Sequence, residues 1–424
     1  MLSAVKVGRV RDEMAIVKPF CSVRATRDKV ALVSSRSYEA YSPAELGAQL
    51  DFNPFSFLHI ISPSYKHHEE ISSEQRFQLI RDKYLEFKEL SNFSKDTSPS
   101  FYIYKKVTTN FSCCGIIAAT STQDYAKNII KKHEETLHKR EVLFEKYLKT
   151  TGFNAEPVLL TYPDNPKIAT ILEKYKKTRA EYEFTTENYK THYLWKVDNL
   201  KDISIIQDEF AKMDAIYIAD GHHRTASSYL LAEDLKSENP NHNGTEDYNF
   251  FMSYLIPESN LQISEYNRLV KDLNGLTKNR LLEKLAVLYR IQNKGTRLYK
   301  PSKKHHFSMY LEGEFYSLYL KKEEFEIDNP LSDLDPQLLY KTILKPIFGI
   351  NDLRNDKRLN YSHSEQGEIN LKNSVDSGKF AIAFGLVPVS VAQLKAVADA
   401  GLKMPPKSTY ILPKLRSGLT IYEF

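Results

Sequence analysis

The segment YIADGHHRTASS, from Tyr217 to Ser228, carries two histidines and an arginine directly after an aspartate and a glycine. The apolar run before Asp220 predicts a strand, and the residues from His222 onward predict a helix. A helix N-terminus has unsatisfied N–H groups and a partial positive charge, so each further cation there is unfavourable by about 0.3–1 kcal/mol. A bound anion reverses the sign of these interactions. Phosphate suits such a turn because glycine lets it approach the backbone closely.

The candidate phosphate site therefore consists of the five residues of this turn, which are Asp220, Gly221, His222, His223 and Arg224. A purely structural alternative stays open, in which the aspartate caps the helix, the glycine makes the turn, the histidines are solvated and the arginine pairs with a surface acid. A metal site is less favoured because adjacent histidines point to different sides of a helix. The chain contains neither the HExxH motif of zinc proteases nor the Walker-A motif of P-loop proteins.

The elements that must position this turn alternate between strands and helices along the whole chain. This order predicts an α/β fold, or α+β with mixed sheets. We also expect Ser42 and Ser390 to cap helices, Gly401 to end one, and Glu312-Gly313 to form the tip of a hairpin. Strands or hairpins are expected at 29–35, 51–63, 99–121, 156–164, 191–199, 215–220, 250–260 and 305–320, and helices at 72–90, 123–148, 171–182, 222–235 and 276–289.

The composition is that of an ordinary globular protein. The chain has 424 residues, of which 42% are hydrophobic and 27% charged, which is enough for two or three domains. We expect domain boundaries near residues 150 and 260, which divide the chain into 1–150, 151–260 and 261–424. The formal net charge of +5 permits an anionic ligand and disfavours nucleic acid as a partner.

Targeting and redox features indicate a cytoplasmic protein. The first residues carry charges where a signal peptide has its apolar core, and no apolar run approaches the ~20 residues of a membrane span. The three cysteines are too few and wrongly spaced for a disulfide framework or a cysteine zinc site. We therefore expect a reducing compartment and no membrane partner.

The stretch IADGHHR (218–224) resembles the phosphate-binding motif of the ParB/sulfiredoxin superfamily, which includes ParB-type CTP-binding proteins, sulfiredoxins and free serine kinases. Further stretches resemble one branch of it, the family known as domain of unknown function 1015. They are KPFCSVRATRDKVALVSSRSYEAYSPAE (18–45), KKHEETLHKRE (131–141) and AVADAGLKMPPKSTYILPKLRSGL (396–419). The resemblance spans nearly the whole chain and implies a ParB/sulfiredoxin-like nucleotide-binding core with an additional α/β domain.

The resemblance also implies an activity. Like the free serine kinases, the chain would be a nucleotide-dependent phosphotransferase for a small hydroxylated metabolite, with free L-serine or phosphoserine the best match. ATP or ADP and Mg²⁺ are the implied cofactors. In the serine kinases this turn holds nucleotide phosphates and an N-terminal carboxylate acts as base. In this sequence Glu39 matches the acidic position of the family's PPYD motif, and the resemblance therefore implies that it is the base or a magnesium contact. His223 is the second catalytic candidate.

The resemblance also implies roles at the site for two further stretches. On the helix expected at 123–148, Glu134 and His138 lie four residues apart and would share a face. The resemblance makes Glu134 a magnesium ligand and brings His133 to the site, whereas a solvated, salt-bridged face is the structural alternative. The C-terminal loop PPKSTYILPKLRSG would close over the nucleotide, and a plain surface loop is its alternative. The nucleotide contacts implied in this loop are Lys407, Ser408 and Thr409.

Three departures from the family pattern keep other functions open. Serines and an arginine precede Tyr38 where the family has proline, the family's HR pair is Asn267-Arg268, and Thr225 replaces a tyrosine. A second hypothesis is therefore a non-catalytic nucleotide-binding regulatory protein. A third, a ParB-like DNA-associated protein, is weakest because no helix-turn-helix is recognisable. The expected partners are a nucleotide and a small-molecule substrate, and a homodimer stays open.

Overall fold

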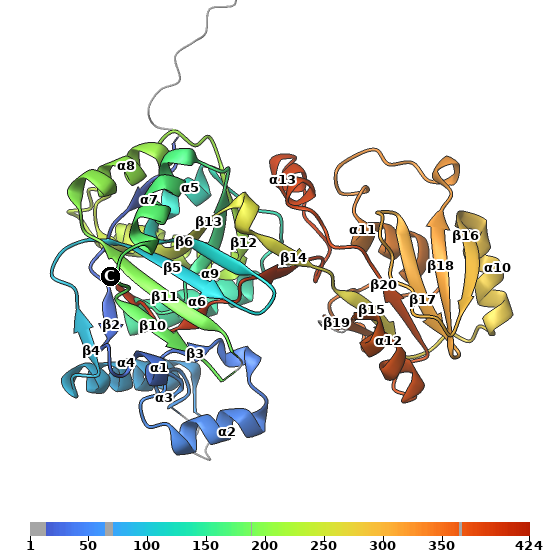
Figure 1. Ribbon diagram of the computed structural model, residues 1–424, viewed down its shortest axis with the longest axis horizontal. Helices are drawn as coiled ribbons and strands as arrows, with labels where there is room; N and C mark the ends of the chain where they lie inside the picture. Colours follow the sequence, from blue (N-terminus) through green and yellow to red (C-terminus); the bar gives the residue numbers. More distant parts are fainter. Residues whose placement is uncertain (1–13, 64–70, 188, 364–366) are drawn as a thin grey trace, which may run out of the picture. The chain divides into compact units, whose positions relative to one another are not determined.

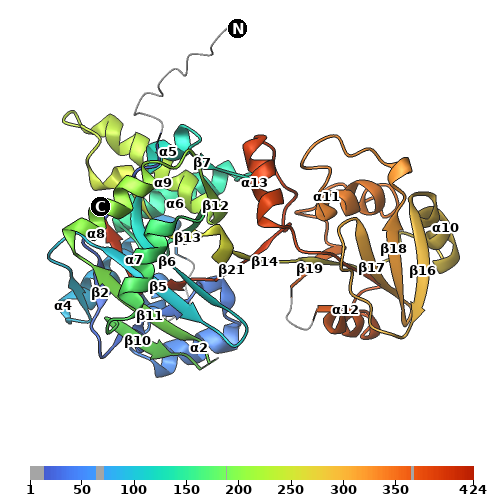
Figure 2. The same cartoon turned by 45° about the horizontal axis from the view of Figure 1, so that its top comes forward.

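The computed structural model describes residues 14–63, 71–187, 189–363 and 367–424 (Figures 1 and 2). Contacts between residues group the chain into two compact units. Unit 1 holds the described residues up to Lys132, together with Thr136–Leu261 and Pro413–Phe424, and unit 2 holds His133–Glu135 and Gln262–Leu412. Strands from both of the first two expected regions, 1–150 and 151–260, form one sheet in unit 1.

Unit 1 is built on a nine-stranded sheet with the strand order β10-β11-β5-β6-β13-β9-β12-β7, and β1 pairs with β6. Most neighbours are antiparallel, but β13–β9 and β12–β7 are parallel. The predicted α/β fold with mixed sheets is confirmed. The strands are β1 (Val17–Lys18), β5 (Phe101–Val107), β6 (Ser112–Ser121), β7 (Ile130–Lys131), β9 (Val158–Tyr162), β10 (Tyr182–Thr185), β11 (Thr191–Val197), β12 (Ile216–Asp220) and β13 (Phe250–Pro257).

One face of this sheet carries the main hydrophobic core of unit 1. Helices α7 (Pro166–Lys176) and α8 (Leu200–Phe210) pack against each other there, and Figure 1 shows them side by side over the sheet. Each helix begins at an asparagine whose side-chain oxygen accepts two backbone N–H bonds, which is the preferred N-cap chemistry. Further helices of unit 1 are α4 (Ser73–Glu89), α5 (Thr122–Ala126), α6 (His138–Thr151) and α9 (His222–Glu238).

The last twelve residues of the chain, Pro413–Phe424, return to unit 1 and pair with its N-terminal part. Strand β22 (Arg416–Ser417) pairs with β3 (Ser35–Arg36), and β23 (Tyr422–Glu423) pairs with β8 (Phe153–Asn154). We call Pro413–Phe424 the tail. The tail is an integral part of the core, because three of its large apolar side chains are buried, those of Leu419, Ile421 and Tyr422. The short strands β2 (Val23–Ala25) and β4 (Phe93–Lys95) form a separate antiparallel pair.

Unit 2 has its own six-stranded antiparallel sheet, of order β16-β18-β17-β20-β15-β19, and its own hydrophobic core. The predicted hairpin tip at Glu312-Gly313 is confirmed, because both residues have positive φ. The strands β14 (Gln262–Ser264) and β21 (Tyr410–Leu412) pair where the chain enters and leaves the unit. The remaining elements are β15 (Asn267–Val270), β16 (Tyr289–Gly295), β17 (His306–Leu311), β18 (Glu314–Leu320), β19 (Leu359–Ser362), β20 (Ile382–Gly385), α10 (Lys278–Leu288), α11 (Asp335–Leu339), α12 (Gly367–Asp376) and α13 (Val391–Asp399).

Two predicted strands near the N-terminus are wrong. The segment 29–35 forms the helical turn α1 (Val30–Val33), and 51–63 contains the end of α2 (Pro43–Phe52) and the turn α3 (Leu58–Ile61). Short apolar runs do not distinguish a strand from a buried helical turn. Here each turn buries apolar residues at helical spacing. The predicted cap at Ser42 is confirmed as a capping box.

The helix predicted over 123–148 is also wrong. The chain instead forms α5, the two-residue strand β7 and, after a non-helical stretch, α6. Asn128 takes a positive φ of 58°, which breaks the helix. Ile130 then pairs with Ile216 at the edge of the sheet, where it is fully buried. Burial in the sheet outweighs the helical preference of the lysine- and glutamate-rich sequence.

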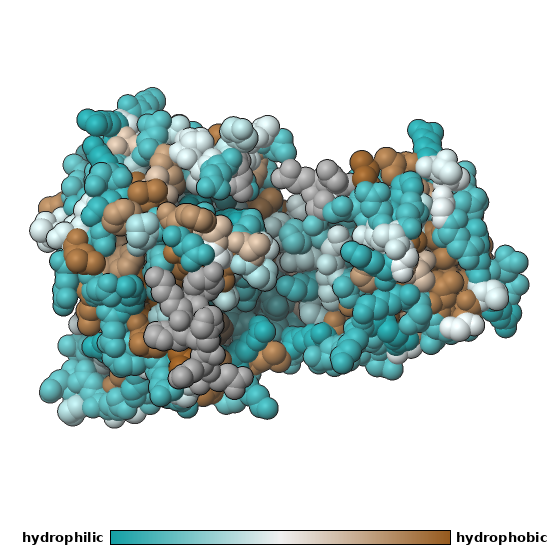
Figure 3. Space-filling model, turned by 90° about the horizontal axis from the view of Figure 1, so that it is seen from below, coloured by the Kyte–Doolittle hydropathy of each residue, from teal (hydrophilic) through white to brown (hydrophobic). Residues whose placement is uncertain are grey.

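The surface that Figure 3 shows is predominantly hydrophilic, with hydrophobic residues in small separate groups. Throughout the described ranges, every helix falls short of the length and apolar character that a membrane span requires.

Candidate functional site

The turn at the centre of the sequence analysis joins the sheet to a long helix. Strand β12 ends at Asp220, and α9 begins at His222. Gly221 is the N-cap residue and adopts a left-handed conformation with φ 104°. It has no side chain to cap the helix, so the expectation that Asp220 is the cap is wrong. The Asp220 carboxylate instead accepts from Arg224 and from Lys414 of the tail.

The Arg224 guanidinium folds back over the helix N-terminus. A Cβ atom placed on Gly221 would lie 3.2 Å from both Nε and Nη2 of Arg224. Nη1 lies 3.0 Å from Oε1 of Glu156 and donates to the Pro157 carbonyl at 2.8 Å, while Nη2 lies 3.2 Å from Oδ2 of Asp220. Two carboxylates thus balance this cation, as in the structural alternative. The side chain is 27% exposed, so a phosphate could still compete for its donors.

The two histidines of the turn have different environments. His222 is buried, whereas His223 is partly exposed beside Arg224. The structural alternative, with both histidines solvated, is therefore wrong for His222. Further along the helix, Ser227 donates to the His223 carbonyl at 2.8 Å. Of the two imidazoles, that of His223 is the one accessible to a ligand.

The tail connects this turn to the N-terminal segment that carries Glu39. Lys414 Nζ lies 3.2 Å from Oδ1 of Asp220, and Ser417 Oγ lies 3.3 Å from Oε2 of Glu156. Between these two contacts, Arg416 pairs with Arg36 in the antiparallel β22–β3 ladder. The ladder is antiparallel, so the direction in which the chain leaves β3 toward Glu39 is the direction from Arg416 back to Lys414 in the tail.

Glu39 itself lies in an exposed 3-10 turn, η1 (Tyr38–Ala40). The residues that follow it are firmly held. Glu45 accepts the Ser42 backbone N–H at 2.9 Å and lies 2.9 Å from Nη2 of Arg36. The Ser42 backbone hydrogen bond and Arg36 lower the pKa of Glu45 to about 2. The predicted base therefore stands on a turn anchored by a capping box on one side and by the tail on the other.

Glu134 and His133 belong to unit 2. His133 is buried, and its carbonyl accepts from the Met404 backbone at 2.8 Å. Glu134 lies in the non-helical stretch before α6, whereas His138 is the first residue of that helix. The predicted shared helical face of Glu134 and His138 is therefore wrong. Within the described ranges, no three His, Cys, Asp or Glu side chains are grouped so as to hold a metal ion.

The predicted closing loop is divided between the units, because Lys407, Ser408 and Thr409 lie in unit 2 and Lys414 and Arg416 in unit 1. In unit 2 the loop is ordered by its own hydrogen bonds. Ser408 is buried and donates to the Pro405 carbonyl at 2.7 Å, and Lys407 has a positive φ of 55°.

The Lys407 carbonyl accepts from the buried Arg268 at 3.1 Å. The neighbouring Asn267 is buried as well, and its side-chain oxygen accepts from the Leu386 backbone at 3.0 Å. Asn267-Arg268 occupies the position of the family's HR pair. In this chain the asparagine side chain is held by a hydrogen bond from the backbone.

A buried basic group that was not predicted from the sequence lies on the face of the sheet that the tail crosses. Lys106 is the last residue but one of β5, His192 stands directly opposite it on β11, and Arg416 comes from the tail. The alternation of side chains along β5 provides a sequence signal for this group. Tyr102 and Tyr104 are buried, and Lys106 shares their face because alternate residues of a strand point to the same side. A lysine on a buried strand face is uncommon and calls for a partner.

Comparisons with known proteins identify a family. The family described as "Protein of unknown function (DUF1015)" matches residues 17–337. No curated protein matches the chain.

Solved structures with some likeness include SbnI with C-terminal truncation from Staphylococcus aureus, at 13% identity and a TM-score of 0.37, covering 71% of this chain and 84% of that one. A free serine kinase in complex with AMP is 12% identical with a TM-score of 0.32, covering 68% and 86%. A conserved hypothetical protein from Pyrococcus furiosus is 14% identical with a TM-score of 0.33, covering 67% and 88%.

Proposed function

Because the chain belongs to the DUF1015 family of proteins of unknown function, we propose that it is a nucleotide-dependent phosphotransferase acting on a small hydroxylated metabolite. The best match for the small molecule is free L-serine as the phosphoryl acceptor, or phosphoserine as the donor in the reverse direction. The nucleotide is ATP or ADP. The observation that carries the proposal is the arrangement of the tail. Its residues Lys414 and Ser417 contact the acids around Arg224, and Arg416 pairs with the strand leading to Glu39.

Phosphoryl transfer requires positioning and charge neutralisation rather than elaborate covalent chemistry. The backbone N–H groups at the start of α9 and the Arg224 guanidinium would hold phosphate oxygens, with Gly221 allowing close approach. His223 would donate to the transferring group. Glu39 would accept the proton of the acceptor hydroxyl at its carboxylate as the new P–O bond forms and the bond to the leaving nucleotide breaks.

Magnesium fits the chemistry of the turn. Mg²⁺ in phosphoryl-transfer sites is bound by one or two carboxylates together with phosphate oxygens. Asp220 and Glu156 supply two carboxylates next to Arg224. When bound, the ion would neutralise charge on the phosphates. Glu134 and the loop residues Lys407, Ser408 and Thr409 stay predictions from the family resemblance.

The test is turnover in both directions. The whole protein is incubated with Mg²⁺, ATP or ADP, and L-serine, or with phosphoserine and ADP, and products are followed by mass spectrometry. Glu39→Gln should lower the rate at least about 100-fold, the size of a general-base contribution, with nucleotide binding unchanged. Glu89→Gln, at another exposed glutamate of unit 1, should retain the wild-type rate. Equal rates for the two variants would contradict the role of Glu39.

A non-catalytic nucleotide-binding regulator is the second candidate. The observation that favours it is Asn267, whose side chain is occupied by a backbone hydrogen bond where the family has histidine. Nucleotide binding that is weakened by Arg224→Ala, without turnover of any hydroxylated metabolite tested, would establish this alternative instead.

A further inference from the structure

Two cations in unit 1, Lys106 and Arg416, donate to neutral acceptors. Lys106 is only 7% exposed, and its Nζ donates to the Lys414 carbonyl at 2.6 Å. Arg416 donates from Nε to Ser34 Oγ at 3.0 Å and from Nη2 to the Ser34 carbonyl. Among the residues that the structure describes, neither Lys106 nor Arg416 forms an ion pair. Both contacts leave N–H donors unused, since an ammonium has three and a guanidinium five.

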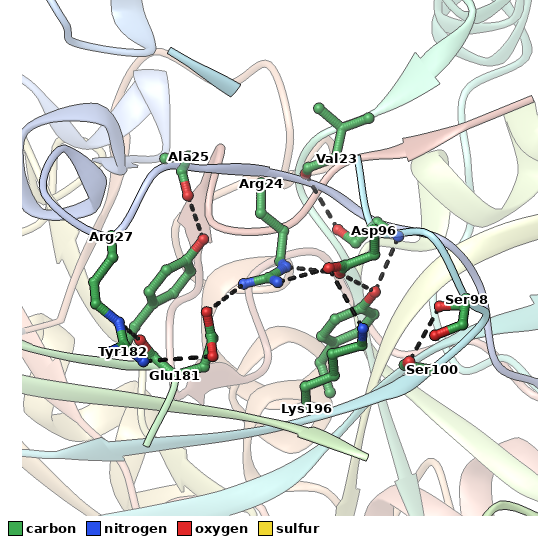
Figure 4. A network of polar contacts seen from close by, with 12 residues as sticks. Val23, Arg24, Ala25, Arg27, Asp96, Ser98, Ser100, Glu181, Tyr182 and Lys196 are labelled. Atoms are coloured by element: carbon green, nitrogen blue, oxygen red, sulfur yellow. Dashed lines mark hydrogen bonds and ion pairs between the residues drawn. The ribbon is translucent and has the colours of Figure 1, made fainter. Parts of the chain in front are cut away.

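Arg24, another buried cation of the same unit, is paired with carboxylates. Figure 4 shows Arg24, whose Nε and Nη2 bind both carboxylate oxygens of Asp96 at 2.8 and 2.7 Å. Glu181 lies 3.7 Å from its remaining nitrogen, and Lys196 also reaches Asp96. A buried charge without such partners costs several kcal/mol. The contrast marks Lys106 and Arg416 as cations that the fold itself does not neutralise.

His192 contributes a third donor at the same place. It is 1% exposed, stacks on Phe184, and lies 2.7 Å through Nδ1 from the Tyr104 hydroxyl. Its Nε2 atom is buried and has no hydrogen-bond partner among the described residues. Which of these two groups donates depends on the imidazole tautomer. With the Tyr104 hydroxyl donating to Nδ1, the ring proton of the neutral imidazole is on Nε2, which is then a buried donor without an acceptor among the described residues.

The electrostatic environment agrees with this geometry. Burial, followed by the nearby cations, lowers the pKa of Lys106 to about 7 and that of His192 to about 2. Burial also lowers the pKa of Arg416. A bound anion would stabilise the charged forms of these side chains and accept hydrogen bonds from their unpaired N–H donors. The titratable and charged groups that face these three are Arg36, Tyr41, Tyr104, Cys113, Glu187, Lys190 and Lys414.

We propose that Lys106, Arg416 and His192 bind a small carboxylate, and that this is the carboxylate of the acceptor molecule. The identity of the ligand as the acceptor rests on the proposed function, whereas the carboxylate site rests on the donors alone. Lys106 donates to the carbonyl of Lys414, Arg416 lies two residues further along the same tail, and Lys414 contacts Asp220. A planar monoanion suits a guanidinium edge and an ammonium that is half protonated near neutral pH. The substrate class is therefore an amino or hydroxy acid rather than an amino alcohol.

The experiment measures equilibrium binding by calorimetry on the whole protein at pH 6.5 without nucleotide. The probes are acetate, L-serine, ethanolamine, which lacks the carboxylate of serine, and O-phosphoethanolamine, which carries a phosphate instead. Wild type should bind L-serine and acetate, and prefer L-serine over ethanolamine. Lys106→Met should weaken carboxylate binding about tenfold or more, the value of one charge-assisted hydrogen bond. The apolar replacement of a buried cation should leave the fold intact.

Lys105→Met is the matched control, because Lys105 precedes Lys106 on β5 and points to the opposite face of the sheet. It should bind every probe as wild type does. Carboxylate binding should also fall as the pH rises from 6 to 9, since deprotonation of Lys106 removes the cation, and this decrease should disappear in Lys106→Met.

Several results would overturn the proposal. Absence of binding of both carboxylates to wild type, or equal effects of Lys105→Met and Lys106→Met, would exclude the site whatever the turnover assay gives. Preference for O-phosphoethanolamine, lost in Lys106→Met, would assign the site to phosphate and overturn the carboxylate assignment. Carboxylate binding with the expected Lys106 dependence but without turnover would support the site and reject only the phosphotransferase function.

Discussion

Among single residues, Gly221 shows most directly how the turn depends on backbone geometry. It combines a φ of 104° with a guanidinium whose Nε and Nη2 atoms lie only 3.2 Å from where a Cβ atom would stand. A side chain at this position would have to adopt a strained conformation and displace Arg224, which contacts Asp220 and Glu156. The residue is therefore needed for the shape of the turn even before any ligand binds.

Gly221→Ala should destabilise unit 1 by ~1–2 kcal/mol, the penalty of a left-handed backbone with a Cβ atom, and weaken nucleotide binding by moving Arg224. The measurement is denaturant unfolding followed by the fluorescence of Trp195, the single tryptophan, which is buried in β11. Gly244→Ala is the control, since Gly244 has a φ of 87° but nothing within 4 Å of its added Cβ. It should share the strain and leave nucleotide binding unchanged. Equal nucleotide binding in both variants would contradict the role of the guanidinium contact.

At the scale of elements, the tail determines which parts of unit 1 meet. It supplies the partner strands of β3 and β8, the carbonyl that accepts from Lys106, and the lysine that contacts Asp220. Its apolar residues fill the core, and Ile421 exchanges two backbone hydrogen bonds with Val23 at 2.9 Å each. We therefore expect the tail to be held by packing as strongly as the strands of the main sheet.

Ile421→Ala should lower the free energy of unfolding by ~2–5 kcal/mol, because truncating a fully buried isoleucine leaves a cavity. The unfolding midpoint of Trp195 fluorescence in denaturant provides the measurement. Leu200→Ala removes a leucine that is exposed at the start of α8 and should change the stability by no more than ~0.5 kcal/mol. If both substitutions had the same small effect, the tail would be a loosely attached segment and could not organise the site.

On the scale of the whole molecule, the main part of unit 2, Gln262–Leu412, is inserted between β13 and the tail of unit 1, and the short segment His133–Glu135 also belongs to unit 2. Its entry and exit strands pair with each other, with Ser264 opposite Tyr410. The two ends of the insertion are therefore already side by side. The hydrophobic core of unit 1 is made entirely of residues outside the insertion, so unit 1 contains what it needs to fold by itself.

Replacing residues 265–409 by Asn-Gly, which favours a two-residue hairpin turn, should leave unit 1 folded. Its Trp195 fluorescence should still unfold in one cooperative transition. The matched comparison is a chain that ends at Leu412 and so lacks only the tail; it should lose that transition because β22, β23 and the buried tail residues are absent. A cooperative transition in the truncated chain, or none in the chain without the insertion, would show that the division into units is wrong.

Local sequence patterns were sufficient to predict the strands and helices that are long or flanked by clear signals. The helix α4, the β5–β6 hairpin, β12 with α9, the Glu312-Gly313 tip and the cap at Ser390 agree with the prediction. Local rules are sufficient there because caps, turn residues and periodicity act over a few residues. The five-residue turn and its glycine could be found in the same way, whereas the family was indicated by the resemblance of four sequence stretches to it.

Tertiary structure alone decided the composition of the site. Arg224 is balanced by Glu156, which is remote in sequence, and Lys106, His192 and Arg416 come from three distant segments. The single helix expected over 123–148 does not form, because pairing with Ile216 buries Ile130 at the edge of the sheet. Burial and charge pairing depend on which segments meet in space, and a pattern read along one segment contains no information about its partner.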